Sequence, residues 1–406
     1  MKIRSRVVYL FIKNIPLLMI VAGAGSLFLS NIIAQKILDV KTFGLFSLHI
    51  FVFSILTISS ALGIEQAIVR LLKIDEGKIT VDKFLVYIIL CIVMFSPLAF
   101  LLLINSFYGF DITFQLYLTI VFVVLSIVAS SFFKVTGDLY SWALVINGWK
   151  YMVPLYVIMI FSLDKFVAFS VFIWSFLFLF LGVAIFLVRK FDLSFASEYK
   201  INYTLSIFLF GLISIVGFAL YDFLDRIIIS KKFSEVEFGR LYFQYTVVVS
   251  FSLIFMSFLS AKKTSAYKRQ ISKELVKKDL FHSFFLSILF CTMGLCLAFS
   301  LNLLSIVDSF YIGDYQTLYF LFFLGVVKST YTIVSAGFNV VCSPRYLFIS
   351  SIYSVFTAAI CIVLFIVNVN NYGIHCVILA ATILWLIRMV IIYSLTLRSI
   401  GLLEKC

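Results

Sequence analysis

The residues of this chain that could do chemistry are single basic residues inside long apolar segments. Lys150, Lys328 and Arg388 each lie within an apolar run that is long enough to cross a membrane. A charge at the centre of a bilayer costs roughly 2.5–3.5 kcal/mol, so a charge that is retained there usually faces a protein interior or a water-filled path. An unneutralised positive interior favours an anionic ligand, and we predict that these three cations help to bind one.

Few carboxylates are placed to neutralise these cations. Glu65 lies near the inner end of the second apolar run, and Asp222 and Asp225 lie near the outer end of the seventh. Counted along the runs, the depths of these carboxylates match those of the three cations poorly. The alternative for each cation is a structural ion pair with another helix, or a side chain that extends to the membrane surface.

Charged residues near the ends of two runs are candidate gates. Asp222 and Arg226 are four residues apart and can pair on one helix face. We predict that Arg226 contributes to the anion site, and that Asp222 and Asp225 help to close the outer side of the path. Glu65 and Arg70 form a candidate inner gate. The alternatives are tight packing of small residues around the seventh run and an interfacial cluster around Glu65.

The composition identifies a membrane protein. Of the 406 residues, 63% are hydrophobic and 13% are charged, with a mean hydropathy of +1.16, whereas ordinary soluble domains carry about 25% charged residues. The apolar residues run continuously rather than alternating, which excludes a β-barrel. We therefore predict an all-α integral membrane protein with about 12 transmembrane helices. The runs are residues 12–34, 43–68, 84–104, 114–133, 141–161, 166–188, 203–229, 241–261, 281–303, 316–341, 346–368 and 374–397.

Two stretches of the chain read alike at an offset of 195 residues. Residues 32–44 align without a gap with residues 227–239, and each is the end of an apolar run, a short charged loop and a Phe-Gly pair that opens the next run. Duplicated halves with the substrate path between them are a common transporter architecture. We therefore predict two six-helix lobes, residues 1–195 and residues 196–406.

The basic residues in the loops predict the orientation in the membrane. With the N-terminus inside, cytoplasmic segments hold 22 of the 32 Lys and Arg residues, and the outside loops hold six. This excess places both termini in the cytoplasm. The net charge of +13 is therefore mostly a topology signal. No domain offers the folded basic surface that nucleic-acid binding requires.

Other chemistries lack their motifs. The loops are short, and the chain has no G-x-x-x-x-G-K-[ST] phosphate loop, so we do not expect ATP to drive it directly. The seven cysteines and three histidines have no metal-ligand spacing. We expect no metal, no cofactor and no enzyme activity, and the sequence leaves coupling to an ion gradient open.

Several motifs together resemble one family. They are the basic N-terminus, Phe43–Ser47 after the first loop, Asp225-Arg226-Ile227-Ile228-Ile229, the Glu237–Tyr242 turn, and twelve runs in about 400 residues. Along its whole length the chain resembles the bacterial polysaccharide repeat-unit flippases, often called the Wzx type, of the multidrug/oligosaccharidyl-lipid/polysaccharide exporter superfamily. Only Asp225 and Arg226 are matched to the family residue by residue.

The resemblance implies a V-shaped pair of six-helix lobes and a flippase function. The expected substrate is an undecaprenyl-diphosphate-linked oligosaccharide, such as an O-antigen repeat unit of lipopolysaccharide. It would move from the cytoplasmic to the periplasmic leaflet of the bacterial inner membrane by alternating access. In such proteins cations of the central cavity hold the diphosphate. The expected partners are this lipid-linked oligosaccharide, membrane lipid and other membrane proteins of polysaccharide assembly.

Two other functions remain as alternatives. A drug or cation antiporter of the same superfamily would need unpaired acidic residues at mid-membrane, whereas the deep charges here are basic. An integral-membrane polysaccharide polymerase has a similar length and composition. It would, however, be expected to carry a large outside loop with arginines, which this chain lacks.

Overall fold

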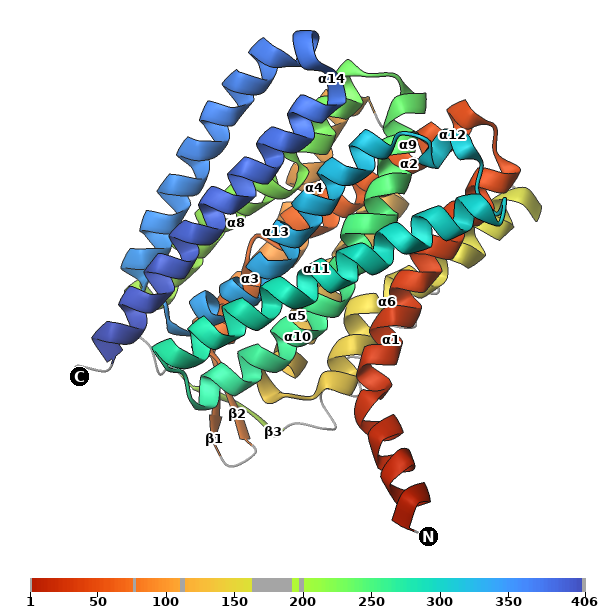
Figure 1. Ribbon diagram of the computed structural model, residues 1–406. Coiled ribbons are helices and arrows are strands. Elements are labelled where there is room, and N and C mark those ends of the chain that lie inside the picture. Colours follow the sequence, from red (N-terminus) through yellow and green to blue (C-terminus); the bar gives the residue numbers. More distant parts are fainter. Residues whose placement is uncertain (1, 76–77, 110–113, 163–191, 197–200, 404–406) are drawn as a thin grey trace.

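The computed structural model describes residues 2–75, 78–109, 114–162, 192–196 and 201–403. These residues form a bundle of long helices that are joined by short loops (Figure 1). The helices of the first half are α1 (Lys2–Ile37), α2 (Val40–Ser60), α3 (Ile64–Leu71), α4 (Lys83–Tyr108), α5 (Phe114–Thr136) and α6 (Leu139–Ser162). Those of the second half are α8 (Ile201–Lys232), α9 (Glu235–Tyr245), the π-helical segment η1 (Thr246–Ser250), α10 (Phe251–Arg269), α11 (Lys273–Leu303), α12 (Ser309–Ile312), α13 (Tyr315–Val341) and α14 (Pro344–Leu403).

The helices confirm the predicted fold class. In the described part of the chain, nine helices are long and apolar enough to cross a membrane. Helices α6 and α8 match the fifth and seventh predicted runs. The sixth predicted run, residues 166–188, lies outside the described residues, so the number of twelve stays a prediction. The chain is a multi-pass membrane protein.

Two predicted runs differ from the helices in detail. The second run, residues 43–68, is broken, because α2 ends at Ser60 and α3 begins at Ile64 after Gly63, which has a φ of 75°. A positive φ suits glycine and ends regular helix geometry. The last two runs are the two arms of α14, which is kinked at Gly373, where φ is 66°. This kink lies between the two predicted runs.

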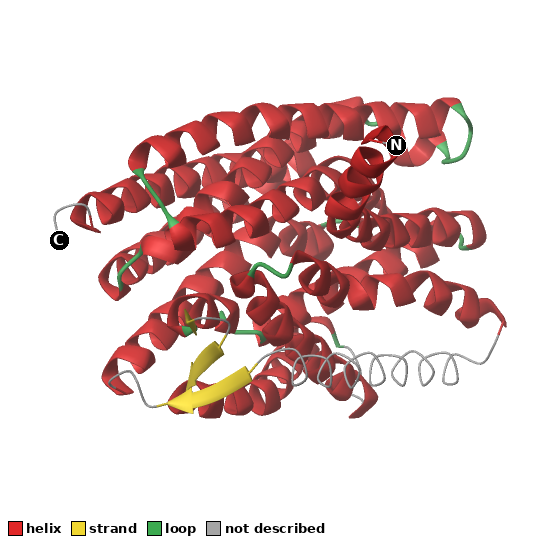
Figure 2. Ribbon diagram, turned by 90° about the horizontal axis from the view of Figure 1, so that it is seen from below, coloured by secondary structure: helices red, strands yellow, loops and turns green. Residues whose placement is uncertain are grey.

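The structure also contains a small β-sheet, which the all-helical prediction did not include. Strands β1 (Lys73–Asp75) and β2 (Lys78–Asp82) form an antiparallel pair, and β3 (Asp192–Ala196) pairs with β2 in parallel. Figure 2 shows the sheet in yellow beside the helix ends, and in Figure 1 it lies toward the end of the bundle where the chain begins. The strands are three to five residues long and lie between hydrophobic runs, so hydropathy alone does not reveal them.

The helix boundaries follow the offset of the predicted repeat, and the division into two six-helix lobes stays a prediction. Helix α1 ends at Ile37 and α8 ends at Lys232, while α2 begins at Val40 and α9 begins at Glu235. Both pairs are 195 residues apart. The N-caps obey the same offset, since the side chain of Asp39 accepts hydrogen bonds from the backbone of α2, and that of Ser234 does so in α9 within a capping box.

The helices pack in pairs within each half, and α2 packs against α9 between the halves. Helix α1 lies along α6, α8 lies along α14, and α13 lies among α10, α11 and α14. At the crossing of α2 and α9, a Cβ atom built on Gly44 would lie 2.2 Å from the backbone oxygen of Glu235, and one on Gly239 would lie 2.9 Å from Cα of Gly44. The Phe-Gly pair of the repeat therefore lets two backbones touch. We call this end of the bundle, where α1 ends and α2 begins, the outer end, after the orientation that the sequence predicts.

Candidate functional site

A cavity of about 480 Å³ lies between the two halves of the chain. Residues of α1, α2 and α6 form its wall on one side, and residues of α8, α9, η1, α10 and α11 form it on the other. Most of the wall is apolar. Among the described residues that line it, the charged ones are Lys150, Asp222 and Arg226. The structure thus brings together two of the four predicted ligand-binding residues, one from each half.

Lys150 comes to the wall from α6. Its Nζ donates a hydrogen bond of 2.9 Å to Oδ1 of Asn147, and the amide of Asn147 donates to the backbone oxygen of Ala143. The hydroxyl of Tyr151 donates to the backbone oxygen of Met19 on α1. These bonds hold the Lys150 ammonium group at the cavity beside α1.

Lys328 lies behind the cavity wall and is not open to the cavity. Its side chain is 1% exposed, and its Nζ is 2.9 Å from Oδ1 of Asp222 and 2.8 Å from the hydroxyl of Tyr245. The expectation of a poor match in depth is wrong for Lys328 and Asp222. Asp222 is ten residues from the end of α8 and Lys328 thirteen from the start of α13. Their depths thus differ by about 4–5 Å at 1.5 Å per residue, which a lysine side chain can span.

Arg226 lies on the wall with its guanidinium group among aromatic rings. Its Cζ is 4.3 Å from the centre of the Tyr245 ring, 5.0 Å from that of Phe223 and 5.2 Å from that of Phe51. Phe51 belongs to α2, so Arg226 links the two halves. Arginine stacks on aromatic faces in this way and keeps its donors in the plane of the group.

The two predicted gate carboxylates of α8 lie in different surroundings. Asp222 is on the cavity wall, with Oδ1 3.7 Å from Nη2 of Arg226, and its backbone oxygen accepts a hydrogen bond from Arg226. Asp225 is 3% exposed, and its Oδ1 is 3.6 Å from Nε of Arg226. The predicted pair of Asp222 and Arg226 is therefore present, and its action as an outer gate stays a prediction.

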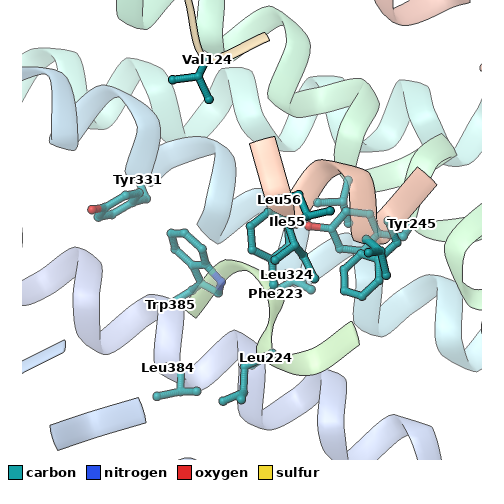
Figure 3. Close-up of a cluster of buried hydrophobic side chains, with 14 of the residues drawn as sticks. Ile55, Leu56, Val124, Phe223, Leu224, Tyr245, Leu324, Tyr331, Leu384 and Trp385 are labelled. Atoms are coloured by element: carbon teal, nitrogen blue, oxygen red, sulfur yellow. The ribbon is translucent and has the colours of Figure 1, made fainter. Parts of the chain in front are cut away.

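Arg388 is the fourth predicted binding residue, and it is buried in the second half away from the wall. Its Nε donates a hydrogen bond of 3.0 Å to the hydroxyl of Tyr331. The Tyr331 ring packs edge-on against Trp385, and Figure 3 shows both side chains. Nζ of Lys328 lies 5.0 Å from the centre of the Trp385 ring. Arg388 is thus joined to the Lys328 cluster through two aromatic rings.

Glu65 and Arg70, the predicted inner gate, lie in α3 and make separate contacts. Glu65 pairs with Lys134 of α5 at 2.7 Å. Arg70 donates from Nε to the backbone oxygen of Asn339 in α13, and Lys268 of α10 donates to the backbone oxygen of Leu72. The last two bonds join the halves at the end of the bundle opposite the outer end, which we call the inner end.

The outer end also carries contacts between the halves. The hydroxyls of Tyr108 in α4 and Ser230 in α8 are 3.0 Å apart, and Nζ of Lys36 is 3.4 Å from the backbone oxygen of Ser305. Nearby, partial burial by itself raises the pKa of Asp314. Hydrogen bonds from Thr317 and the charge of Arg240 outweigh this effect, so the pKa lies below its usual value. Contacts between the halves therefore lie beyond the cavity at both the inner end and the outer end of the bundle.

Several residues of the wall are not among the predicted site residues. Asn31 of α1 lies on it, is 2% exposed, and carries an Oδ1 without a hydrogen-bond partner among the described residues. The repeat offers a signal for it, because the offset of 195 places Asn31 opposite Arg226. The wall also holds Tyr242, Tyr245 and, in η1, Thr246. A π-helical segment often marks a functional site, but a hydropathy pattern does not reveal one.

Comparisons with known proteins identify the fold. No protein-family model matches the chain, and no curated protein matches its sequence. The chain is similar to a solved structure of a multidrug resistance MATE family transporter of the MOP superfamily in an outward-facing conformation. The TM-score is 0.64 and the identity 15%, over 97% of this chain and 95% of that one. The chain therefore has the fold of a MATE family transporter.

Proposed function

We propose that this protein is a flippase for an undecaprenyl-diphosphate-linked oligosaccharide, acting by alternating access between its two halves in the bacterial inner membrane. The superfamily of the structural neighbour, the duplicated halves and the cavity between them support a transporter. The observation that carries the substrate class is the charge of the cavity wall: among its described residues two cations, Lys150 from the first half and Arg226 from the second, outnumber the carboxylate of Asp222.

The two cations suit a headgroup that carries phosphate. A bare diphosphate crossing hydrocarbon would lose its hydration at prohibitive cost, whereas Lys and Arg in a cavity replace that hydration with charge-assisted hydrogen bonds. The rest of the wall is apolar and aromatic, with rings such as Trp142 and Tyr242 on which sugars can stack. The polyprenyl chain would remain in lipid.

The alternating-access cycle would exchange the contacts between the halves. At the inner end, the bonds from Arg70 and Lys268 to backbone oxygens of the opposite half would break while substrate enters. At the outer end, the contact of α2 with α9 and the bond between Tyr108 and Ser230 would break while it leaves. The carboxylates Asp222, Asp225 and Glu65 would change partners as the halves move.

A drug or cation antiporter is the second candidate, and the fold alone is equally consistent with it. An antiporter would use Asp222, the carboxylate on the described wall, to bind an organic cation. Asp222 already lies 2.9 Å from Nζ of Lys328 and 3.7 Å from Nη2 of Arg226, so its charge is compensated. This compensation favours an anionic substrate over a cationic one.

Depletion of the protein from cells that carry it tests the proposed function. We expect lipid-linked oligosaccharide to accumulate in the cytoplasmic leaflet, where a membrane-impermeant glycosidase digests it in inverted vesicles but not in right-side-out vesicles. Wild-type protein should reverse the accumulation. Unchanged lipid-linked oligosaccharide in depleted cells, together with greater sensitivity to cationic drugs, would contradict the flippase and support the antiporter.

A further inference from the structure

Asp222 lies between the cavity and the buried cation Lys328. Among the described residues that line the wall, Asp222 is the one that carries a carboxylate. Its side chain is 19% exposed, whereas that of Lys328 is 1% exposed. The Asp222 carboxylate accepts a hydrogen bond from Lys328, and the Arg226 guanidinium lies beside it. A carboxylate oxygen with a cation on either side occupies the position that a phosphate oxygen of a ligand would take.

Two polar atoms of the cavity wall, on Arg226 and Asn31, have no hydrogen-bond partner among the described residues. Nε of Arg226 has no hydrogen-bond partner among the described residues, since Asp225 is 3.6 Å away. Oδ1 of Asn31, on the opposite wall, is also without one in the described part of the chain. Buried polar atoms are nearly always satisfied in folded proteins, so such atoms on a cavity wall indicate a ligand or water.

The four residues nearest this position carry equal numbers of positive and negative charges, and Arg388 adds a further positive charge behind Tyr331. Lys328 and Arg226 contribute two positive charges, and Asp222 and Asp225 contribute two negative ones. Asp222 has a route to the cavity, because its side chain is partly exposed there, whereas Asp225 is 3% exposed and does not line the wall. Asp222 is thus the acidic member of the cluster whose carboxylate has access to the cavity.

We propose that Asp222 is an exchangeable counter-ion of the anion site. In the empty protein its carboxylate neutralises Lys328 and Arg226; an arriving phosphate displaces it toward the cavity, and its return expels the phosphate on release. Asp222 therefore lowers the affinity for the anion and speeds its departure, which a carrier needs because a ligand held too tightly is not released. This role deepens the proposed function and rests on it for the identity of the anion.

Binding of farnesyl diphosphate to the purified full-length protein tests this role. The titration follows calorimetric heat, with farnesol as the uncharged control. We expect Asp222→Asn to bind farnesyl diphosphate about tenfold more tightly than wild type, the gain of roughly one charge-assisted hydrogen bond. Farnesol affinity should not change. Asp225→Asn removes the same charge from the same turn of α8, and we expect a smaller gain because Asp225 does not lie between the cavity and Lys328.

The outcomes separate this role from the proposed function. If wild type binds farnesyl diphosphate and Asp222→Asn binds it no more tightly, the counter-ion role is wrong and the proposed function stands. If neither protein binds it at millimolar concentration, both are wrong. Equal gains for farnesol, or for Asp225→Asn, would also overturn the role. Should Asp222→Asn unfold in detergent, Asp222→Ser provides the same comparison, and Asp222→Glu, which keeps the carboxylate, should bind like wild type.

Discussion

At the residue scale, the sequence identified the cations of the candidate site and a short set of candidate partners, but it did not select among these partners. Lys150 and Arg226 lie on the cavity wall, whereas Lys328 and Arg388 are buried behind it. Depth counted along a run does not include the length of the lysine side chain or the true ends of the helices. For this reason the pair of Lys328 and Asp222 stands in the sequence analysis only as an alternative to ligand binding. A lone buried charge in one helix says little about which other helix faces it.

Lys328 is therefore expected to contribute to folding as well as to binding. Removing one partner of a buried ion pair leaves the other charge uncompensated, so Lys328→Met should destabilise the protein by about 3 kcal/mol. The double replacement Lys328→Met with Asp222→Asn should cost less than the sum of the two single replacements. Melting temperatures of the three purified variants and wild type measure this coupling. Strictly additive losses would show that the two side chains do not interact.

At the element scale, hydropathy predicted the long helices well and the irregular elements poorly. The run 316–341 corresponds to α13, Tyr315–Val341, and the run 84–104 to α4, Lys83–Tyr108. The break between α2 and α3, the segment η1 and the small sheet were not predicted. They depend on backbone angles and on pairing between distant segments, since β3 pairs with a strand more than one hundred residues earlier.

The contact of α2 with α9 gives a prediction about the outer end. A methyl group at Gly44 or Gly239 would collide with backbone of the opposite half, so Gly44→Ala and Gly239→Ala should push the two helices apart. In each variant, we expect a cysteine placed at Ser54, on the cavity wall, to react faster with a membrane-impermeant maleimide added from outside. The variants would be made in a background with the native cysteines replaced.

Gly25→Ala is the matched control for this experiment. A Cβ atom at Gly25 meets nothing within 4 Å, so the same added methyl group should leave the labelling rate at Ser54 unchanged. If Gly44→Ala and Gly239→Ala label no faster than Gly25→Ala, the glycine contact does not close the outer end.

At the scale of the whole molecule, the repeat was the most informative feature of the sequence. It predicted two similar halves with a path between them, and the structure has the same helix boundaries at an offset of 195 residues and a cavity lined by both halves. The sequence could not place α2 against α9, because apolar helices of similar composition offer no pattern that selects one neighbour over another.

The central claim is that this cavity carries a lipid-linked anion across the membrane, and transport in proteoliposomes tests it most directly. Wild-type protein should move a fluorescent undecaprenyl-diphosphate sugar between leaflets faster than protein-free vesicles do. Lys150→Gln should reduce this rate at least about tenfold, as expected for the loss of a charge-assisted contact. Lys41→Gln, the same change at an exposed position, should not reduce it. A wild-type protein that leaves the labelled lipid in place, or a Lys150→Gln protein that moves it at the wild-type rate, would contradict the claim.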